Sequence, residues 1–239
     1  KYYKLANKNK KIKTNFVSLE LGPGNSIISG LISKAYGAKA SWLIDEGSYA
    51  TTNLKLFKET IDLLKNKSIY LPVIKNSVSV NEILKRYNIK YRTNGLKSFK
   101  EIKDNTIDFC WSQVVLEHVS YDQFNDLLKE LKRVLKSDSI SIHSIDFKDH
   151  LGGSLNNLRF SEKIWESNFF KNSGFYTNRI RPFQMIKLFQ DSGFTVNILD
   201  TTRWDKIPVK RKRLSQKFKM CKDDDLLVSE ILIELQLLR

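Results

Sequence analysis

The sequence predicts an α/β fold: a doubly wound, mostly parallel seven-stranded sheet with an antiparallel last strand. Short apolar runs alternate with segments of helical periodicity along most of the chain, and two further apolar runs close it. Alternation of this kind places successive strands parallel, with helices on both faces of the sheet. With 239 residues, 41% of them hydrophobic, and no low-complexity linker, residues 1–239 are expected to form a single domain.

Seven strands are expected where apolar runs are short and bounded by turn residues. They cover residues 16–21, 41–45, 89–92, 107–112, 139–145, 194–199 and 226–237. Ligands of such sheets bind beyond the carboxyl ends of the strands, where the strand order reverses. The motifs described below all lie at such ends.

Four helices are expected between these strands, over residues 25–36, 54–64, 121–136 and 183–191. The third has the clearest pattern, since its apolar residues share one stripe: Phe124, Leu127, Leu128, Leu131, Val134 and Leu135. The fourth ends at Ser192-Gly193, a sequence typical of a helix C-terminus.

The chain is strongly basic, with a net charge of +15, six lysines within residues 1–13 and eight basic residues within 206–222. This charge raises nucleic acid, anionic membrane and acidic glycan as partners, or a surface that is merely solvated by lysine. Aromatic residues do not interleave with the basic runs and no RNA-binding motif is present, which argues against nucleic acid. Peripheral contact with an anionic membrane stays open.

Cysteine usage and hydropathy indicate a cytoplasmic protein. Cys110 and Cys221 lack metal or redox spacing, which fits a reducing compartment. Neither a membrane-spanning apolar run nor a signal peptide is visible. Because the chain starts at Lys1 and not at Met, residues can be missing before it.

A glycine turn follows the first strand, in the segment Glu20-Leu21-Gly22-Pro23-Gly24. Two glycines allow a tight turn and close approach of a ligand to the backbone. A dinucleotide fingerprint would place a third glycine where Ile27 stands, and the segment has no Gly-Lys-Ser/Thr of a P-loop. Glu20 would repel a pyrophosphate, so the expected ligand is poor in negative charge or cationic.

This segment is similar to the E/D-x-G-x-G motif of class I S-adenosylmethionine-dependent methyltransferases. Asp45, at the end of the second strand, matches the acid that binds the ribose hydroxyls in that family. The stretches 108–119 and 131–136 resemble the family's fourth-strand segment and the helix end before strand five. The resemblance implies a Rossmann-like class I methyltransferase fold and S-adenosylmethionine as cofactor. The implied cofactor-binding residues are Glu20, Gly22, Pro23, Gly24, Asp45, Ser112 and Gln113.

By motif, the resemblance covers residues 14–147, the expected cofactor-binding part, and leaves 148–239 as the acceptor-side part with the closing strands. Residues 66–106 match no motif, so no adenine contact is assigned. The stretches 143–153, 158–161 and 174–181 resemble a methyltransferase subgroup found in bacterial surface-polysaccharide biosynthesis. The implied reaction is O-methylation of a sugar hydroxyl, in a glycan or a nucleotide- or lipid-linked sugar.

A sugar hydroxyl needs a base as the methyl group moves, and imidazole has a suitable pKa. His150 lies past the fifth strand and is the main candidate, His143 lies inside that strand and is a catalytic or a core residue, and His118 could line the acceptor pocket. Asp146 and Asp149, with these histidines, could alternatively hold Mg²⁺, which would lower the pKa of the acceptor hydroxyl. Asp149 could instead cap the next turn.

An anionic acceptor would be bound by Arg159, Arg179 and Arg181, because guanidinium matches phosphate or carboxylate bidentately. Each of these arginines could equally be a solvated or ion-paired surface residue. Tyr176 could stack on a sugar ring, whereas Trp165 and Trp204 are expected in the core.

Two other functions stay open. One is a non-catalytic S-adenosylmethionine-fold protein that binds RNA or anionic membrane through the basic runs. The other is a methyltransferase acting on RNA or protein. Ser112-Gln113-Val114-Val115 stands where amino-methylating members often carry Asn/Asp-Pro-Pro-Tyr, which argues against base N-methylation.

Overall fold

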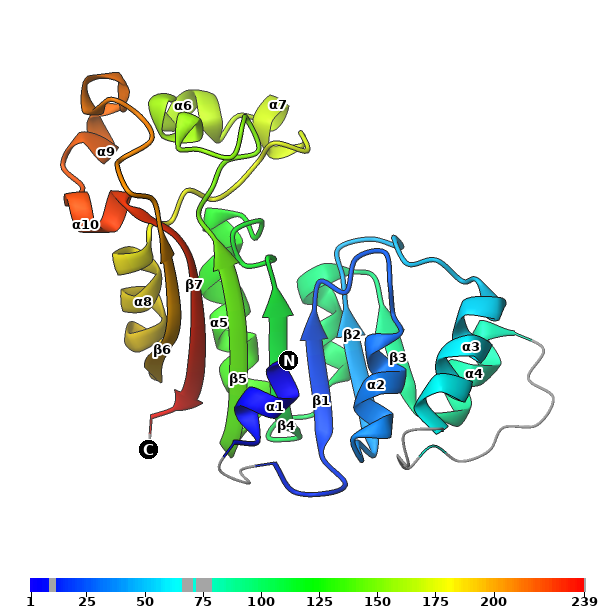
Figure 1. Cartoon of the computed structure of the whole chain (residues 1–239). Helices are drawn as coiled ribbons and strands as arrows, with labels where there is room; N and C mark the ends of the chain where they lie inside the picture. Colours follow the sequence, from blue (N-terminus) through cyan, green and yellow to red (C-terminus); the bar gives the residue numbers. More distant parts are fainter. Residues whose placement is uncertain (9–11, 66–70, 72–78, 239) are drawn as a thin grey trace. The chain divides into compact units, whose positions relative to one another are not determined.

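The computed structural model describes residues 1–8, 12–65, 71 and 79–238. Its strands form a seven-stranded sheet in the order β3-β2-β1-β4-β5-β7-β6 (Figure 1). The pairs β1–β2, β1–β4 and β2–β3 are parallel, and β6–β7 is antiparallel. The predicted fold class, a mostly parallel sheet closed by an antiparallel strand, is therefore confirmed.

The strands lie close to their predicted positions. They are β1 (Val17–Leu21), β2 (Ala40–Ile44), β3 (Ile89–Arg92), β4 (Ile107–Gln113), β5 (Leu135–Asp146), β6 (Phe194–Arg203) and β7 (Val228–Leu237). The largest difference is at β5, which takes over two residues that helical periodicity placed in the preceding helix. Lys136 pairs with Asp108 of β4 at 2.5 Å, a contact between distant residues that helical periodicity does not reveal.

The helices outnumber the four that periodicity predicts. They are α1 (Tyr2–Ala6), α2 (Ser29–Ala35), α3 (Leu54–Lys65), α4 (Val80–Arg86), α5 (Tyr121–Val134), α6 (Glu162–Trp165), α7 (Asn168–Lys171), α8 (Pro182–Asp191), α9 (Gln216–Lys219) and α10 (Asp223–Leu226), with 3-10 turns η1 (Gly95–Glu101), η2 (Asn156–Arg159) and η3 (Arg211–Arg213). Of those missed, α4 carried a readable signal. Its N-cap Ser79 accepts the N–H of Glu82, as in a Ser-x-x-Glu capping box.

The chain divides into two compact units: unit 1 comprises residues 1–112 and 130–142, and unit 2 comprises residues 113–129 and 143–238. A single domain with a cofactor-binding part at residues 14–147 stays a prediction. Parts of two sequence features, the basic run 1–13 and the unassigned stretch 66–106, fall at residues 9–11, 66–70 and 72–78, outside the described residues.

In unit 1, helices α2, α3 and α4 share a core with β2 and β3 that includes Leu31, Leu43, Phe57 and Ile83. Tyr3 of α1 stacks on Tyr36, directly after α2, and on Phe16, directly before β1, at centroid distances of 4.5 and 5.5 Å, and it meets Phe109 of β4 edge to face at 6.3 Å. These contacts cover the strands with aromatic surface and place α1 beside α2.

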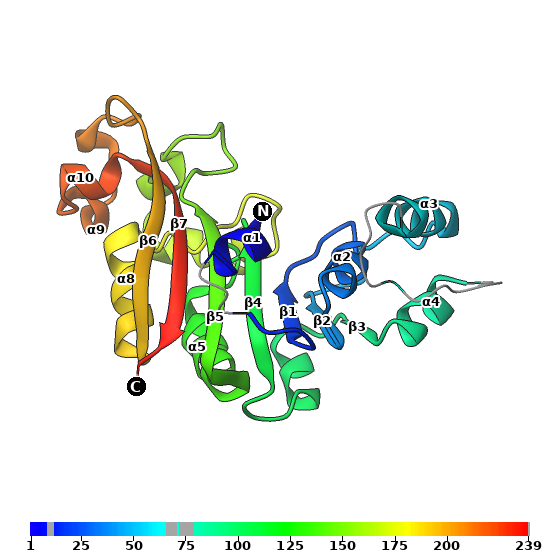
Figure 2. The ribbon, with the colours of Figure 1, turned by 60° about the horizontal axis from the view of Figure 1, so that its bottom comes forward.

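In unit 2, helix α8 lies along β6 (Figure 2), and its Phe189 meets Phe124 of α5 edge to face. A separate small core joins η2 to the segment 204–226 through Leu158, Leu214 and Phe218. Trp165 is fully buried, as expected for a core residue, and Trp204 packs at the edge of the small core. Among the described residues, no helix is long and apolar enough to cross a membrane.

Candidate active site

The glycine turn at the end of β1 has the conformation that its sequence requires. Gly22 and Gly24 have φ values of +62° and +63°, which favour glycine because it has no Cβ. Gly22 donates its N–H to the carbonyl of Ile44 at 2.8 Å, which ties the turn to the end of β2. No described heavy atom lies within 4 Å of a Cβ built on Gly24, so this face of the turn is open.

Asp45, directly after β2, holds the turn through its buried carboxylate. One oxygen accepts the N–H of Gly24 at 2.8 Å and the other accepts the N–H of Glu46 at 2.8 Å. A carboxylate oxygen has two lone pairs, so each keeps capacity for one further donor. The site therefore offers paired acceptors next to an open glycine backbone.

Glu20, near the end of β1, has its carboxyl group in a mostly buried position. Ser29, the first residue of α2, donates its hydroxyl to Glu20, and Trp111 also hydrogen-bonds to it. Burial raises the pKa of Glu20 to about 7, and the Asp45 charge adds to the increase. Near neutral pH this group can take up or release a proton when a charged ligand binds.

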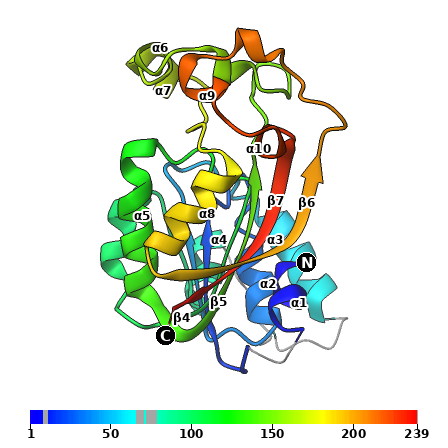
Figure 3. The same ribbon diagram turned by 90° about the vertical axis from the view of Figure 1, so that its left-hand side faces the viewer.

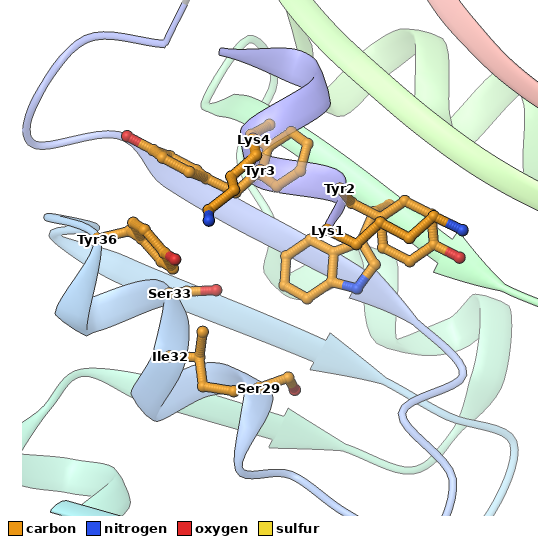
Figure 4. Close-up of a pocket in the computed structure, with 10 residues that line it drawn as sticks. Lys1, Tyr2, Tyr3, Lys4, Ser29, Ile32, Ser33 and Tyr36 are labelled. Atoms are coloured by element: carbon orange, nitrogen blue, oxygen red, sulfur yellow. The ribbon is translucent and has the colours of Figure 1, made fainter. Parts of the chain in front are cut away.

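Ser29 and Trp111 also line a hollow of about 160 Å³ between α1, α2 and β4. Figure 4 shows Tyr2 and Tyr3 of α1 on one side of the hollow, with Ser29 and Ser33 of α2 and the following residue, Tyr36, on the other. Five of its ten lining residues are aromatic, and the two residues that hydrogen-bond to Glu20 form part of its wall.

Unit 2 contains two loops, residues 114–120 after β4 and 147–155 after β5. His118 lies on the first and His150 on the second, and their rings are 4.9 Å apart between centroids. Both side chains are exposed at the surface of the unit. The structure thus brings together two of the three histidines that the sequence singled out.

Backbone carbonyls fix the orientation of both rings. The Nδ1 of His118 lies 3.1 Å from the Tyr176 carbonyl oxygen, and the Nδ1 of His150 lies 3.2 Å from the Gly174 carbonyl oxygen. Because a carbonyl oxygen only accepts, Nδ1 carries the hydrogen in each ring, and the neutral ring has its lone pair on Nε2. Loss of solvent around the ring, together with the nearby His150, lowers the pKa of His118, which favours this neutral form.

Glu117, beside His118, is a buried acid. Its Oε1 accepts the N–H of Asp146 at 3.3 Å, and its Oε2 has no hydrogen-bond partner among the described residues. Burial, with the charges of Asp146 and Glu230, raises the pKa of Glu117 to about 8, so the group is largely protonated at neutral pH.

The two aspartates considered for Mg²⁺ have other contacts. Asp149 is buried and accepts backbone N–H groups of Leu151, Ser154 and Asn156, which is the turn-capping role. Asp146 pairs with Lys148 at 2.9 Å. In the part of the chain that the structure describes, no group of three or more His, Cys, Asp or Glu residues could hold a metal ion, so nothing here supports Mg²⁺.

The remaining candidates divide into exposed and buried residues. Arg159 and Gln113 are exposed. Arg179, Arg181 and Tyr176 are buried, and the Tyr176 hydroxyl donates to Glu166 at 3.0 Å. His143 is completely buried in β5, and burial lowers its pKa to about 3, so it is a neutral core imidazole at neutral pH.

Both buried arginines serve the backbone. Arg181 donates to the carbonyls of Phe147, Asp225 and Val228 at 2.7–3.2 Å. Arg179 donates to the Phe160 carbonyl at 2.8 Å, and its guanidinium lies over the Trp165 ring. These contacts hold loops of unit 2 together.

The chain is similar to known methyltransferases in sequence and in fold. A family model described as a methyltransferase domain matches residues 19–142, slightly more than half of the chain. The chain belongs to the S-adenosylmethionine-dependent methyltransferases. The match spans the glycine turn, Asp45 and the His118 loop. No curated protein sequence matches the chain.

Solved methyltransferase structures share the fold at low sequence identity. An arsenic(III) S-adenosylmethionine methyltransferase from Chlamydomonas reinhardtii superposes with a TM-score of 0.55 at 12% identity, over 95% of this chain and 64% of that one. A phosphoethanolamine N-methyltransferase from Haemonchus contortus gives 0.53 at 14%, over 98% and 51%. A putative S-adenosylmethionine-dependent methyltransferase from Listeria monocytogenes gives 0.50 at 15%, over 97% and 95%.

For this methyltransferase, sequence reasoning missed several contributors to the site. Trp111 and Ser29 reach Glu20 from β4 and α2, and nothing in their spacing indicates it. Val114, after β4, has a φ of +56°, a value that a β-branched residue rarely adopts. Strained backbone of this kind costs about 1–3 kcal/mol and often marks a functional loop.

Proposed function

We propose that unit 1 binds S-adenosylmethionine through the glycine turn, Asp45 and Glu20. The open face of Gly24 admits a ligand close to the backbone, and the Asp45 oxygens can accept the two ribose hydroxyls. The Glu20 carboxylate would bind the cationic methionine end of the cofactor. Bound S-adenosylmethionine supplies an electrophilic methyl group.

The reaction proposed is O-methylation of a sugar hydroxyl in a glycan or in a nucleotide- or lipid-linked sugar. The observation that supports it best is the pair His118 and His150, both with Nδ1 bonded to carbonyls and Nε2 left as a base. As the hydroxyl oxygen bonds to the methyl carbon and the sulfur–carbon bond breaks, the hydroxyl proton passes to Nε2. The expected contribution of such a base is about 10²–10⁴-fold.

His150 is the preferred base, and His118 lies next to it. Arg159 is exposed and free to contact a phosphate or carboxylate on the acceptor. Because the resemblance to polysaccharide-biosynthesis methyltransferases rests on the same stretches, 143–153 and 158–161, the sugar class is the proposed acceptor.

Two substitutions of His150 test whether its imidazole acts as the base. His150→Asn keeps an amide N–H in place of Nδ1–H but has no base, whereas His150→Ala loses both. Both variants should bind S-adenosylmethionine with the affinity of the parent protein in calorimetry. Both should lose about 10²–10⁴-fold in turnover on a panel of sugar acceptors. Lys163→Ala, on the exposed face of α6, is the matched control and should keep full turnover.

Two outcomes would overturn parts of the proposal. If His150→Asn turns over as fast as the parent protein, His150 is not the base, and His118→Asn is the next variant. If a chelator abolishes turnover and Mg²⁺ restores it, a metal activates the hydroxyl instead. Turnover on RNA or protein but on no sugar of the panel would replace the acceptor class.

A further inference from the structure

Three one-turn helices of unit 2 each pack one aromatic residue inward and have one large apolar residue exposed in the helix or directly after it. In α6, Trp165 is fully buried while Ile164 is 50% exposed. In α7, Phe170 stacks on Trp165 at 4.8 Å while Phe169 is 78% exposed. At α9, Phe218 is buried while Met220, just past the helix, is 82% exposed. Packing of Trp165, Phe170 and Phe218 anchors the helices and keeps the exposed apolar side chains at the surface.

These helices form one surface, which we call the cap and define as residues 151–178 and 204–227. The side chain of Lys217 in α9 reaches Glu162 of α6 at 2.6 Å. The N–H of Ser215 donates to the Leu158 carbonyl at 2.9 Å. Figures 1 and 3 both show α6, α7 and α9 together at one end of unit 2.

The cap also carries unpaired positive charge. Arg211 and Lys217 are bonded to Asp223 and Glu162. Within its segment 210–222, five further basic side chains are exposed and have no carboxylate within ion-pair distance among the described residues: Lys210, Lys212, Arg213, Lys219 and Lys222. Apolar side chains fixed outward among unpaired cations are the composition that binds an anionic bilayer surface.

We propose that the cap docks this methyltransferase on an anionic lipid surface. Ile164, Phe169 and Met220 would enter the headgroup region, and the five cations would lie among the lipid phosphates. Of these three apolar side chains only Phe169 has an aromatic face on which a base could stack, so the surface suits a bilayer better than RNA. The proposal rests on the proposed function, because docking would serve to bring the enzyme to its acceptor. A lipid-linked sugar lies on the membrane surface to which the cap would bind.

Vesicle sedimentation tests the docking without cofactor or acceptor. The parent protein should sediment with phosphatidylcholine vesicles that contain phosphatidylglycerol and stay in solution with phosphatidylcholine alone. Phe169→Ser with Met220→Ser should weaken sedimentation at least about tenfold, as the loss of two buried apolar side chains implies. Tyr49→Ser with Leu63→Ser, which removes exposed apolar residues of unit 1, is the matched control and should change nothing.

A charge series completes the experiment. Changing Lys210, Lys212, Arg213 and Lys219 to Gln should also weaken binding at least about tenfold, and about 0.5 M salt should do the same to the parent protein. The control changes four exposed lysines of unit 1, Lys58, Lys97, Lys100 and Lys132, to Gln. Equal loss in this control would show that total charge, and not the cap, binds lipid, and would overturn the proposal.

Three other outcomes would also overturn it. The first is a parent protein that does not sediment with anionic vesicles, the second is dimerisation through the cap in solution, and the third is binding of single-stranded RNA through these residues without binding of lipid. The inactive His150→Asn variant should sediment like the parent protein. Its behaviour separates the two hypotheses, since docking can fail while sugar methylation stands, and methylation can fail while docking stands.

Discussion

The raised pKa of Glu20 makes cofactor affinity depend on pH. In the free protein, burial holds this pKa at about 7, so below pH 7 the carboxyl group is mostly protonated and neutral. A cationic ligand favours the ionised form. S-adenosylmethionine binding should therefore expel a proton below pH 7, and the affinity should rise with pH until it levels off above 7.

The size of the effect follows from the two pKa values. If the bound cofactor returns the carboxyl group to its ordinary pKa of 4.5, the difference from about 7 corresponds to about 3.4 kcal/mol. Affinity at pH 6 should then be about tenfold weaker than at pH 8, and at pH 5 about 70-fold weaker. Between pH 5 and 6, close to one proton should be released for each cofactor bound.

Titration calorimetry in buffers of different ionisation heat measures both quantities. Glu20→Gln should bind more weakly at pH 8 but show a flat pH profile and no proton release. Glu59→Gln, an exposed acid on α3, is the control and should titrate like the parent protein. A parent protein whose affinity is the same at pH 5 and pH 8, or a Glu20→Gln variant that keeps the full pH dependence, would refute this reasoning.

Four further variants are expected to distinguish residues that bind a ligand from residues that affect the stability of the fold. Asp45→Ala should weaken S-adenosylmethionine binding at least about tenfold in calorimetry, since hydrogen bonds to a charged acceptor are worth about 1.5–3 kcal/mol; unchanged affinity would exclude it from the ribose site. Arg181→Met should lower the free energy of unfolding in urea by about 3–5 kcal/mol, because three backbone carbonyls lose a buried charged donor. The exposed Arg159→Met should change it by less than about 0.5 kcal/mol. If Arg181→Met keeps its stability and raises only the acceptor Michaelis constant, this arginine is a substrate clamp. Val114→Gly should raise the free energy of unfolding by about 1 kcal/mol, since glycine relieves the positive φ; a fall would show that the side chain matters more than the strain.

Local patterns were sufficient to predict most of the sheet. Apolar runs bounded by turn residues placed all seven strands, and the stripe on residues 121–134 placed α5. The elements that were missed are short: α6, α7, α9 and α10 have four residues each, about one turn, and show no period. Their stability comes from packing around Trp165 and Phe218, which depends on residues far apart in the chain.

The candidate site also contains parts that local sequence predicts and parts that depend on residues far apart in the chain. The glycine turn could be placed from spacing alone, because positive φ values demand glycine at Gly22 and Gly24. The protonation of Glu20 and Glu117 could not, since burial by distant strands and loops sets both pKa values. The roles of the arginines also depended on burial: an exposed Arg159 and a buried Arg181 look alike in sequence.

The orientation of the histidine pair depends on the cap as much as on the loops that carry it. Nδ1 of His150 and of His118 bond to the carbonyls of Gly174 and Tyr176, on the segment that leaves α7. The indole of Trp165 donates to the carbonyl of Thr177 at 2.7 Å, so the packing of α6 fixes the same segment. A shift of the cap would move the two carbonyls and release the ring hydrogens. Since a mobile imidazole is a poorer base than an oriented one, anything that orders the cap, an anionic lipid surface included, is expected to raise turnover without touching the acceptor.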